Sequence, residues 1–249
     1  MKRLLIILFI LFATITTFLI VLELKFNHLK SSPFFYENQS QKFWAHHGYS
    51  LKGNPYSIRD IQSAVNKGFD GVELDLFYSQ ELNTFLVAHN EPIEDTLMLE
   101  DVLKITENSI NYWFDLKNLN SQNVGEVIIR LEELNELYQL QHHFMVESKD
   151  AKNLQQLTEK GIHTCLWLNS PRPQEFFHFY FSNIVNKITL VFYDYDAISI
   201  PYFIYKNKEY QDFYKFNTCT WMGNDMVDLY KNDAANNKEL KIILIDRLE

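Results

Sequence analysis

The sequence predicts an α/β protein, a (β/α)₈ TIM barrel preceded by one N-terminal transmembrane helix. Residues 4–22 form an apolar run without a charged side chain. From Phe43 onward, short β-branched or aromatic runs alternate with longer stretches of helical spacing. About 207 residues follow position 42, which is the low end of the length that such a barrel needs.

The composition excludes several other classes of protein. The chain has 249 residues, of which 47% are hydrophobic, with seven Gly, two Cys and a net charge of −9. Disordered chains are less hydrophobic, collagen needs about one-third glycine, and disulfide scaffolds need more cysteine. Nucleic acid is not an expected partner, because no cluster of Lys and Arg is present to meet its phosphates.

The apolar run predicts an uncleaved signal anchor over residues 1–23. At about 1.5 Å per residue it can cross a hydrocarbon core of about 30 Å, and no small-x-small cleavage site follows it. Lys2 and Arg3 predict a cytoplasmic N-terminus and an extracytoplasmic domain, although Lys25 and Lys30 weaken the charge asymmetry. A cleaved signal peptide remains the alternative. Residues 24–42 are predicted to form a polar spacer, and residues 43–249 the barrel.

The strands and helices of the barrel are predicted from hydrophobic periodicity and capping residues. A further run at 84–89 follows the second strand too closely for a parallel neighbour, so it should fold back as a hairpin or cross the barrel mouth. A doubly wound sheet is the alternative fold, but no G-x-G-x-x-G follows the first strand. The predicted strands are 43–48, 71–77, 112–118, 143–148, 163–168, 188–194, 217–222 and 241–246, and the helices are 57–67, 96–107, 121–138, 150–160, 172–182, 198–214 and 223–235, with Ser57, Asp95 and Asp150 among the caps.

Titratable side chains gather near the ends of the first four predicted strands. The carboxyl ends of barrel strands meet at one mouth, so we expect these side chains to converge there. Cys165 and Cys219 fall on two predicted strands with one strand between them. The distance between two such strands exceeds the reach of a disulfide, so both cysteines should be free thiols. The candidates for the mouth are His46, His47, Glu73, Asp75, Asp115, Lys117, Glu147 and Lys149, with His89 at the end of the hairpin.

Three acids in this set suggest a metal site. Glu73 and Asp75 are two residues apart on one strand, so both carboxylates point to the same face. Buried side by side they repel unless a cation lies between them, and Asp115 can supply a third oxygen. Oxygen ligands without cysteine favour Mg²⁺ or Ca²⁺. A structural role, with Lys117 pairing Asp115, remains the alternative.

Several motifs resemble those of the glycerophosphodiester phosphodiesterases, in the PLC-like phosphodiesterase superfamily. The similar stretches are Ala45-His46-His47-Gly48, then Gly68-Phe69-Asp70-Gly71-Val72-Glu73-Leu74-Asp75, then Val87-Ala88-His89-Asn90, and near the other end Thr220-Trp221-Met222-Gly223-Asn224-Asp225. The resemblance implies a TIM barrel, a divalent metal held by Glu73 and Asp75, and an acid–base pair of His46 and His89.

The chain departs from the family pattern at the phosphate-binding positions. The family arginine is His47 here, and the family P-E-N-T glutamate falls near Pro55, where no acid is present. Asn54 or Lys52 could replace a lost phosphate contact. The later family glutamate becomes Asp115, as in the sphingomyelinase D branch, and Lys117 is retained.

Together these features predict a membrane-anchored, metal-dependent phosphodiester hydrolase. Its expected substrates are glycerophosphodiesters or (lyso)phospholipid head groups. Lys117 would add a fixed positive charge beside the two catalytic histidines. The alternative is a non-catalytic, membrane-tethered barrel that binds the same head groups. The predicted pocket walls are His47, Glu147, Lys149 and Trp221, with Trp167 and Tyr193 as further candidates.

Overall fold

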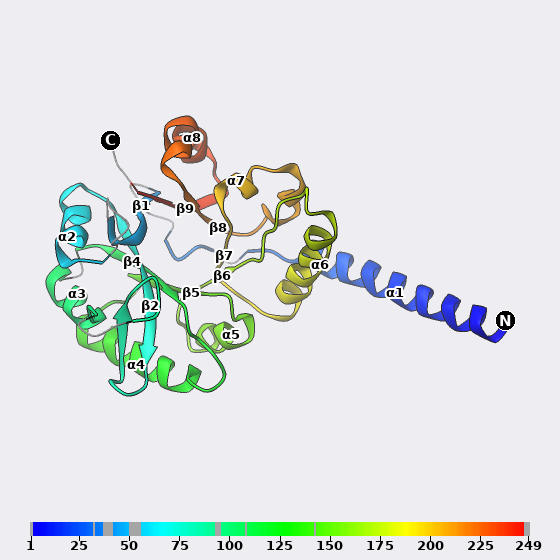
Figure 1. Cartoon of the computed structure of the whole chain (residues 1–249), viewed down its shortest axis with the longest axis horizontal. Helices are drawn as coiled ribbons and strands as arrows, with labels where there is room; N and C mark the ends of the chain where they lie inside the picture. The colour runs from blue at the N-terminus through cyan, green and yellow to red at the C-terminus, as the bar shows by residue number, and fades with distance from the viewer. Residues whose placement is uncertain are drawn as a thin grey trace.

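Eight parallel strands close into a barrel with helices outside it, so the predicted TIM-barrel fold is confirmed (Figure 1). The computed structural model describes residues 2–31, 33–36, 42–49, 56–92, 96–107, 109–141 and 143–246. The predicted cap Asp95 and the phosphate contacts Lys52 and Asn54 lie outside these ranges. The barrel strands are β1 (Phe43–Ala45), β2 (Gly71–Ser79), β4 (Asn111–Leu116), β5 (Phe144–Ser148), β6 (Thr164–Trp167), β7 (Ala197–Ser199), β8 (Thr218–Met222) and β9 (Leu240–Ile245).

The extra apolar run forms a hairpin, which was one of the two predicted arrangements. Strand β3 (Thr84–Val87) pairs antiparallel with the end of β2, with Leu76 opposite Val87. Asn83, in the turn, has a φ of 47°, a left-handed conformation that asparagine tolerates. The hairpin extends β2 beyond the barrel and carries His89 back toward the mouth.

The helices follow the predicted order, and two predicted caps are in place. Ser57 and Asp150 each accept a hydrogen bond from the backbone N–H three residues on. The helices are α1 (Lys2–His28), α2 (Ile58–Asn66), α3 (Leu99–Thr106), α4 (Val124–Tyr138), α5 (Ala151–Glu159), α6 (Phe176–Phe192), α7 (Tyr202–Tyr205) and α8 (Asn224–Asn236), with 3₁₀ turns η1 (His46–Tyr49) and η2 (Lys208–Phe213).

The strand predicted at 188–194 is wrong, because residues up to Phe192 continue helix α6. The buried side chains of α6 are Phe179, Ser182, Asn186 and Leu190, which recur at helical spacing and pack on the barrel. This packing outweighs the β-branched composition of residues 188–191. The sixth barrel strand is β7 instead, so the helices predicted at 172–182 and 198–214 are also displaced. Tyr193 is the C-cap of α6 and does not line the pocket at the strand ends that is described below.

The barrel interior is filled by aromatic and aliphatic side chains. Trp44 and Trp113 are fully buried there, and Gly71 leaves room for the Trp44 ring, since a Cβ at that position would lie 2.1 Å from it. Cys165 on β6 and Cys219 on β8 are buried free thiols with β7 between them, as predicted.

Helix α1 is long and apolar enough to cross a membrane, and its end is attached to the barrel domain. Leu22 and Phe26 are buried, and Glu23 pairs with Lys187 of α6 at 2.8 Å. Past the helix, Ser31 accepts a hydrogen bond from the backbone N–H of Asn217. Phe34 is buried among the interior side chains of the barrel. The described part of the predicted spacer therefore packs on the barrel.

Candidate active site

The candidate site is a pocket of about 170 Å³ at the carboxyl ends of the barrel strands. Most of the residues predicted to converge do line it. The exception is Lys149, which lines a neighbouring cavity. The pocket residues are His46, His47, Glu73, Asp75, His89, Trp113, Asp115, Lys117, Glu147, Trp167, Trp221 and Leu244.

Three buried carboxylates form the floor of this pocket. Glu73 and Asp75 alternate along β2 with Leu74 and Leu76, which are buried on the opposite face. Asp115 on β4 lies directly across from Asp75. One oxygen from each acid lies within 4.8 Å of the other two, a spacing that a single cation can bridge.

The acids differ in how easily they ionise. Burial, with the neighbouring Asp75 charge, raises the pKa of Glu73 well above its usual range. Burial also raises the pKa of Asp115 to about 6, against the opposing charge of Lys117. Burial disfavours the charged form of Asp75 as well, but hydrogen bonds from His47, Lys117 and Tyr56 outweigh it and hold its pKa well below its usual range.

Lys117 places its ammonium group against two of the carboxylates. It forms ion pairs with Asp75 and Asp115, whose charges raise its pKa above the usual value despite the cost of burial. The Asp75 ion pair runs through Oδ1, so this oxygen faces the Lys117 ammonium group. One ammonium does not balance three acids. The donor set therefore fits a hard divalent cation.

The histidines stand around the carboxylates on a sharply turned segment. His47 and Gly48 have φ values of 46° and 62°, and this turn lets the backbone N–H of His47 donate to Glu73 Oε2 at 2.8 Å. The His47 ring stacks on His46, with centroids 3.8 Å apart, and its Nδ1 lies 3.2 Å from Asp75 Oδ2. The His89 ring packs edge to face with the His47 ring, with centroids 5.2 Å apart.

Asp246 orients His46 and was not among the site residues predicted from the sequence. His46 Nδ1 and Asp246 Oδ1 are 2.8 Å apart. Burial lowers the pKa of His46, and Asp246 partly opposes that effect. Asp246 follows the last residue of β9 at the mouth, so the strand-end rule used for the other acids could have found it.

Tyr56 is a second residue that sequence reasoning missed. Its hydroxyl donates to Asp75 Oδ2 and accepts from the backbone N–H of Asp75 at 3.1 Å. It precedes α2 on a connection whose path no periodicity predicts.

Glu147 lies on β5, directly across from Asp115, and is held by two donors. Trp113 Nε1 donates to Oε2 at 3.0 Å, and the Ser199 hydroxyl donates to Oε1. Burial raises the pKa of Glu147 to about 8, although both hydrogen bonds favour the charged form. This side chain is therefore largely protonated at neutral pH.

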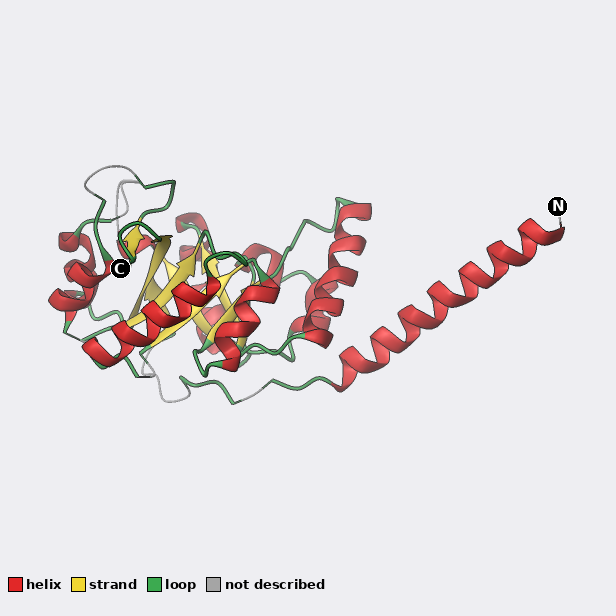
Figure 2. Ribbon diagram, turned by 90° about the horizontal axis from the view of Figure 1, so that it is seen from below, coloured by secondary structure: helices red, strands yellow, loops and turns green. Residues whose placement is uncertain are grey.

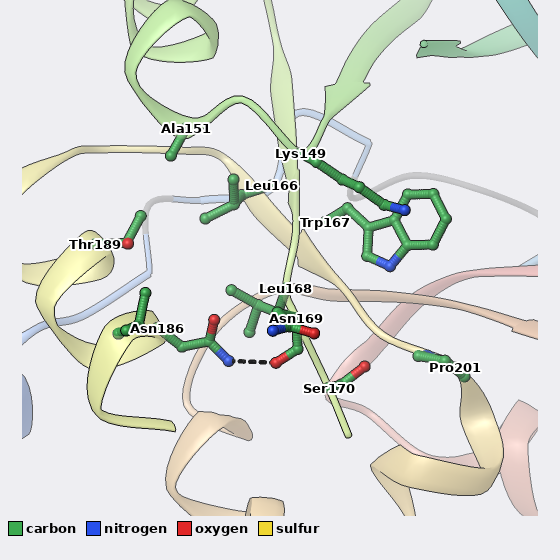
Figure 3. A pocket seen from close by; sticks show the side chains of 11 residues that line it. Lys149, Ala151, Leu166, Trp167, Leu168, Asn169, Ser170, Asn186, Thr189 and Pro201 are labelled. Carbon is green, nitrogen blue, oxygen red and sulfur yellow. Dashed lines mark hydrogen bonds between the residues drawn. The ribbon is translucent and has the colours of Figure 1, made fainter. Parts of the chain in front are cut away.

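A second cavity of about 410 Å³ adjoins the pocket at the rim of the barrel (Figure 3). Lys149 extends over the Trp167 ring, with Nζ 3.6 Å from the ring centroid, and Trp167 lines both cavities. On the outer side the cavity is bounded by α6, where Asn186 Nδ2 donates to the Asn169 carbonyl at 2.8 Å. A contact between Lys149 and substrate remains a prediction.

No family model and no curated protein sequence matches this chain significantly. Solved structures do match it. A glycerophosphodiester phosphodiesterase from Parabacteroides distasonis superposes with a TM-score of 0.62 at 15% identity, over 83% of this chain and 92% of that one. The enzyme from Thermotoga maritima gives 0.61 at 16% identity, over 84% and 96%.

A third similar structure carries a ligand. It is an Oleispira antarctica phosphodiesterase in complex with the product sn-glycerol-3-phosphate, with a TM-score of 0.59 at 12% identity, over 85% of this chain and 95% of that one. The fold and the pocket define an α/β barrel with an acidic, histidine-flanked mouth. More particularly, the chain shares the barrel fold of the glycerophosphodiester phosphodiesterases, as its motifs suggested.

Proposed function

We propose that this protein is a membrane-anchored, metal-dependent phosphodiesterase that acts on glycerophosphodiesters or on (lyso)phospholipid head groups. One observation carries the proposal: His46 and His89 stand at the same pocket as three buried carboxylates that together fit a cation. The similar structures are phosphodiesterases, and one of them holds sn-glycerol-3-phosphate, which supports a small phosphodiester substrate.

In this proposal Glu73, Asp75 and Asp115 hold the metal. A bound Mg²⁺ or Ca²⁺ would offset the charge that develops on the phosphoryl oxygens. The ammonium group of Lys117 adds a fixed positive charge at the same place. His47 stands where the family has arginine. Its imidazole offers a single ring nitrogen, whereas an arginine guanidinium can donate two hydrogen bonds to one phosphate.

Two imidazoles move the protons. One takes a proton from the attacking hydroxyl, and the other gives a proton to the leaving oxygen as its bond to phosphorus breaks. Asp246 holds the Nδ1 side of His46, so the other ring nitrogen of His46 is left for the substrate. His89 is exposed, follows the hairpin strand β3, and its ring contacts the His47 ring edge to face.

Helix α1 is proposed as the anchor, with the barrel on the extracytoplasmic side. Lys2 and Arg3 precede the apolar run, and the apolar residues of α1 are exposed almost to its end. A cleaved signal sequence would have the same length and apolarity. To distinguish the two, membranes from cells that express the full chain are isolated and extracted at alkaline pH. An anchored protein stays in the membrane pellet.

The proposed activity is tested on the full chain in detergent or nanodiscs with a panel of glycerophosphodiesters and lysophospholipids. Release of the alcohol should require Mg²⁺ or Ca²⁺ and should be lost in His46→Ala and Glu73→Gln. The control is Glu132→Gln, which changes an exposed acid on α4. A wild-type protein that binds phosphodiesters and hydrolyses none of them would instead be the non-catalytic binding barrel.

A further inference from the structure

Helix α6 carries an apolar surface that the barrel does not cover. Its outward side chains form the aromatic face, defined here as Phe176, Phe177, Tyr180, Phe181, Val185 and Phe192. Phe177 is 87% exposed and Phe181 is 68% exposed. The helix has two basic side chains and no acid. His178 lies beside Glu175, and Lys187 is largely buried and pairs with Glu23 and Asp212.

So large an apolar surface is unusual on a free domain. A buried Phe or Tyr removes about 150–250 Å² from water, whereas the largest apolar patch on a typical monomer covers about 300–600 Å². The five aromatic side chains are 54–87% exposed, so together they leave about 500–850 Å² in contact with water, at or above the top of that range. An occupant that excludes water from the aromatic face is therefore expected.

The position of α6 beside α1 indicates what that occupant is. Leu22 and Phe26 of α1 are buried, and Glu23 pairs with Lys187, whose Nζ also lies 5.0 Å from the Phe26 ring centroid. Figure 1 shows α6 at the edge of the barrel from which α1 departs. Figure 2 shows α1 leaving the barrel domain from one side and extending away from it at an oblique angle. A bilayer that accepts α1 would therefore begin at α6.

We propose that the aromatic face of α6 lies in the interface of the same bilayer that α1 spans. The inference rests on the proposed anchor and adds a second membrane contact to it. An amphipathic helix with an apolar, aromatic face lies along the boundary of head groups and acyl chains, where Tyr can also keep its hydroxyl hydrated. The barrel then sits against the membrane in one orientation rather than turning freely on a spacer.

This orientation brings the mouth of the barrel to the lipid head groups. Helix α6 follows β6 and begins on the side of the barrel where the catalytic pocket opens. Its Asn186 and Thr189 line the rim cavity, which shares Trp167 with that pocket (Figure 3). Phosphodiesters carried by lipids of this bilayer are therefore the substrate class that the geometry favours over soluble ones.

The test places a fluorescent label at single introduced cysteines. The native thiols Cys165 and Cys219 are buried, so an exposed cysteine reacts selectively. The three variants of the full chain are Phe181→Cys on the aromatic face, Leu137→Cys on α4, where the native side chain is also 68% exposed, and Ile10→Cys in α1. Each labelled protein is reconstituted in phosphatidylcholine vesicles with and without brominated acyl chains, which quench fluorophores that they contact.

The inference predicts quenching at positions 181 and 10, of roughly twofold or more, and none at position 137. Quenching at 10 without quenching at 181 overturns the contact of α6 and leaves the anchor standing. A label at 10 that is not quenched refutes the anchor and the inference together. A label at 181 that is shielded from water but insensitive to bromine, in a chain that forms dimers, shows a second copy as the occupant and also overturns the inference.

A pair of substitutions tests the consequence for substrate. Phe177→Gln with Phe181→Gln should leave hydrolysis of a water-soluble glycerophosphodiester unchanged, because neither side chain lines the catalytic pocket. Hydrolysis of a lysophospholipid embedded in vesicles should fall by roughly tenfold. Equal rates on the vesicle substrate before and after the change would contradict the proposed orientation.

Discussion

Replacing Glu147 with Gln should remove a large part of the pH dependence of folding. The folded barrel holds the pKa of Glu147 at about 8, against an ordinary value of 4.5. Between these two values the unfolded chain has lost a proton that the folded barrel keeps. The stability contributed by this group is therefore fully present below pH 4.5 and falls as the pH rises toward 8.

The size of the effect follows from the same two values. Each pH unit costs about 1.4 kcal/mol, so the free energy of unfolding should fall by about 4 kcal/mol between pH 5 and pH 8 through this group alone. Gln fits the same position: its carbonyl oxygen can accept from Trp113, which only donates, and its amide can donate to the Ser199 hydroxyl. In Glu147→Gln this decline should disappear.

The measurement is urea unfolding of the full chain in detergent micelles, followed by tryptophan fluorescence with divalent ions chelated. Wild type and Glu147→Gln should differ in unfolding free energy by an amount that changes by about 4 kcal/mol across pH 5 to 8. The control Glu132→Gln, at an exposed site on α4, should follow wild type at every pH. A difference that stays constant with pH would refute the reasoning, since Glu147 would then be ionised in the folded barrel.

Three further substitutions test the site and the core. Asp246→Asn should lower kcat roughly 100-fold with little change in KM, and should move the limb of the pH–rate profile that reports His46 to lower pH, because Asp246 raises that pKa. Lys117→Met should destabilise the metal-free barrel by about 3–5 kcal/mol and enlarge the rise in melting temperature on adding Mg²⁺ or Ca²⁺, because two buried carboxylates lose their cation. Gly71→Ala should lower the free energy of unfolding by about 1–3 kcal/mol, and with it the urea midpoint, since the new methyl group meets a tryptophan ring. Gly125→Ala, in the first turn of α4 with open space around it, should raise stability slightly. Unchanged kinetics in Asp246→Asn would contradict the first prediction. An unchanged response to metal in Lys117→Met would contradict the second, and an unchanged urea midpoint in Gly71→Ala the third.

The error at residues 188–194 shows where local composition fails. Ile188, Val191 and their neighbours suit a strand or a helix equally well, and both states bury apolar surface. Contacts of α6 with the barrel and with α1 select the helix, and these contacts join residues far apart in the sequence. The strand that takes this place in the barrel, β7, has only three residues. That is too short for a recognisable alternation of apolar and polar residues.

The sequence by itself determined the barrel, the apolar N-terminal helix and most of the residues at the mouth. These follow from hydrophobic periodicity and from the rule that parallel strands bring their carboxyl ends to one side. Only the tertiary structure decided which side chains become partners there, such as Asp246 for His46 and Tyr56 for Asp75. It also decided that α6 lies beside α1 with its aromatic face outward. The first pairing depends on the closure of the barrel between β1 and β9, which joins residues 200 positions apart. The second depends on the path of the connection between β1 and α2, and neither leaves a local pattern in the chain.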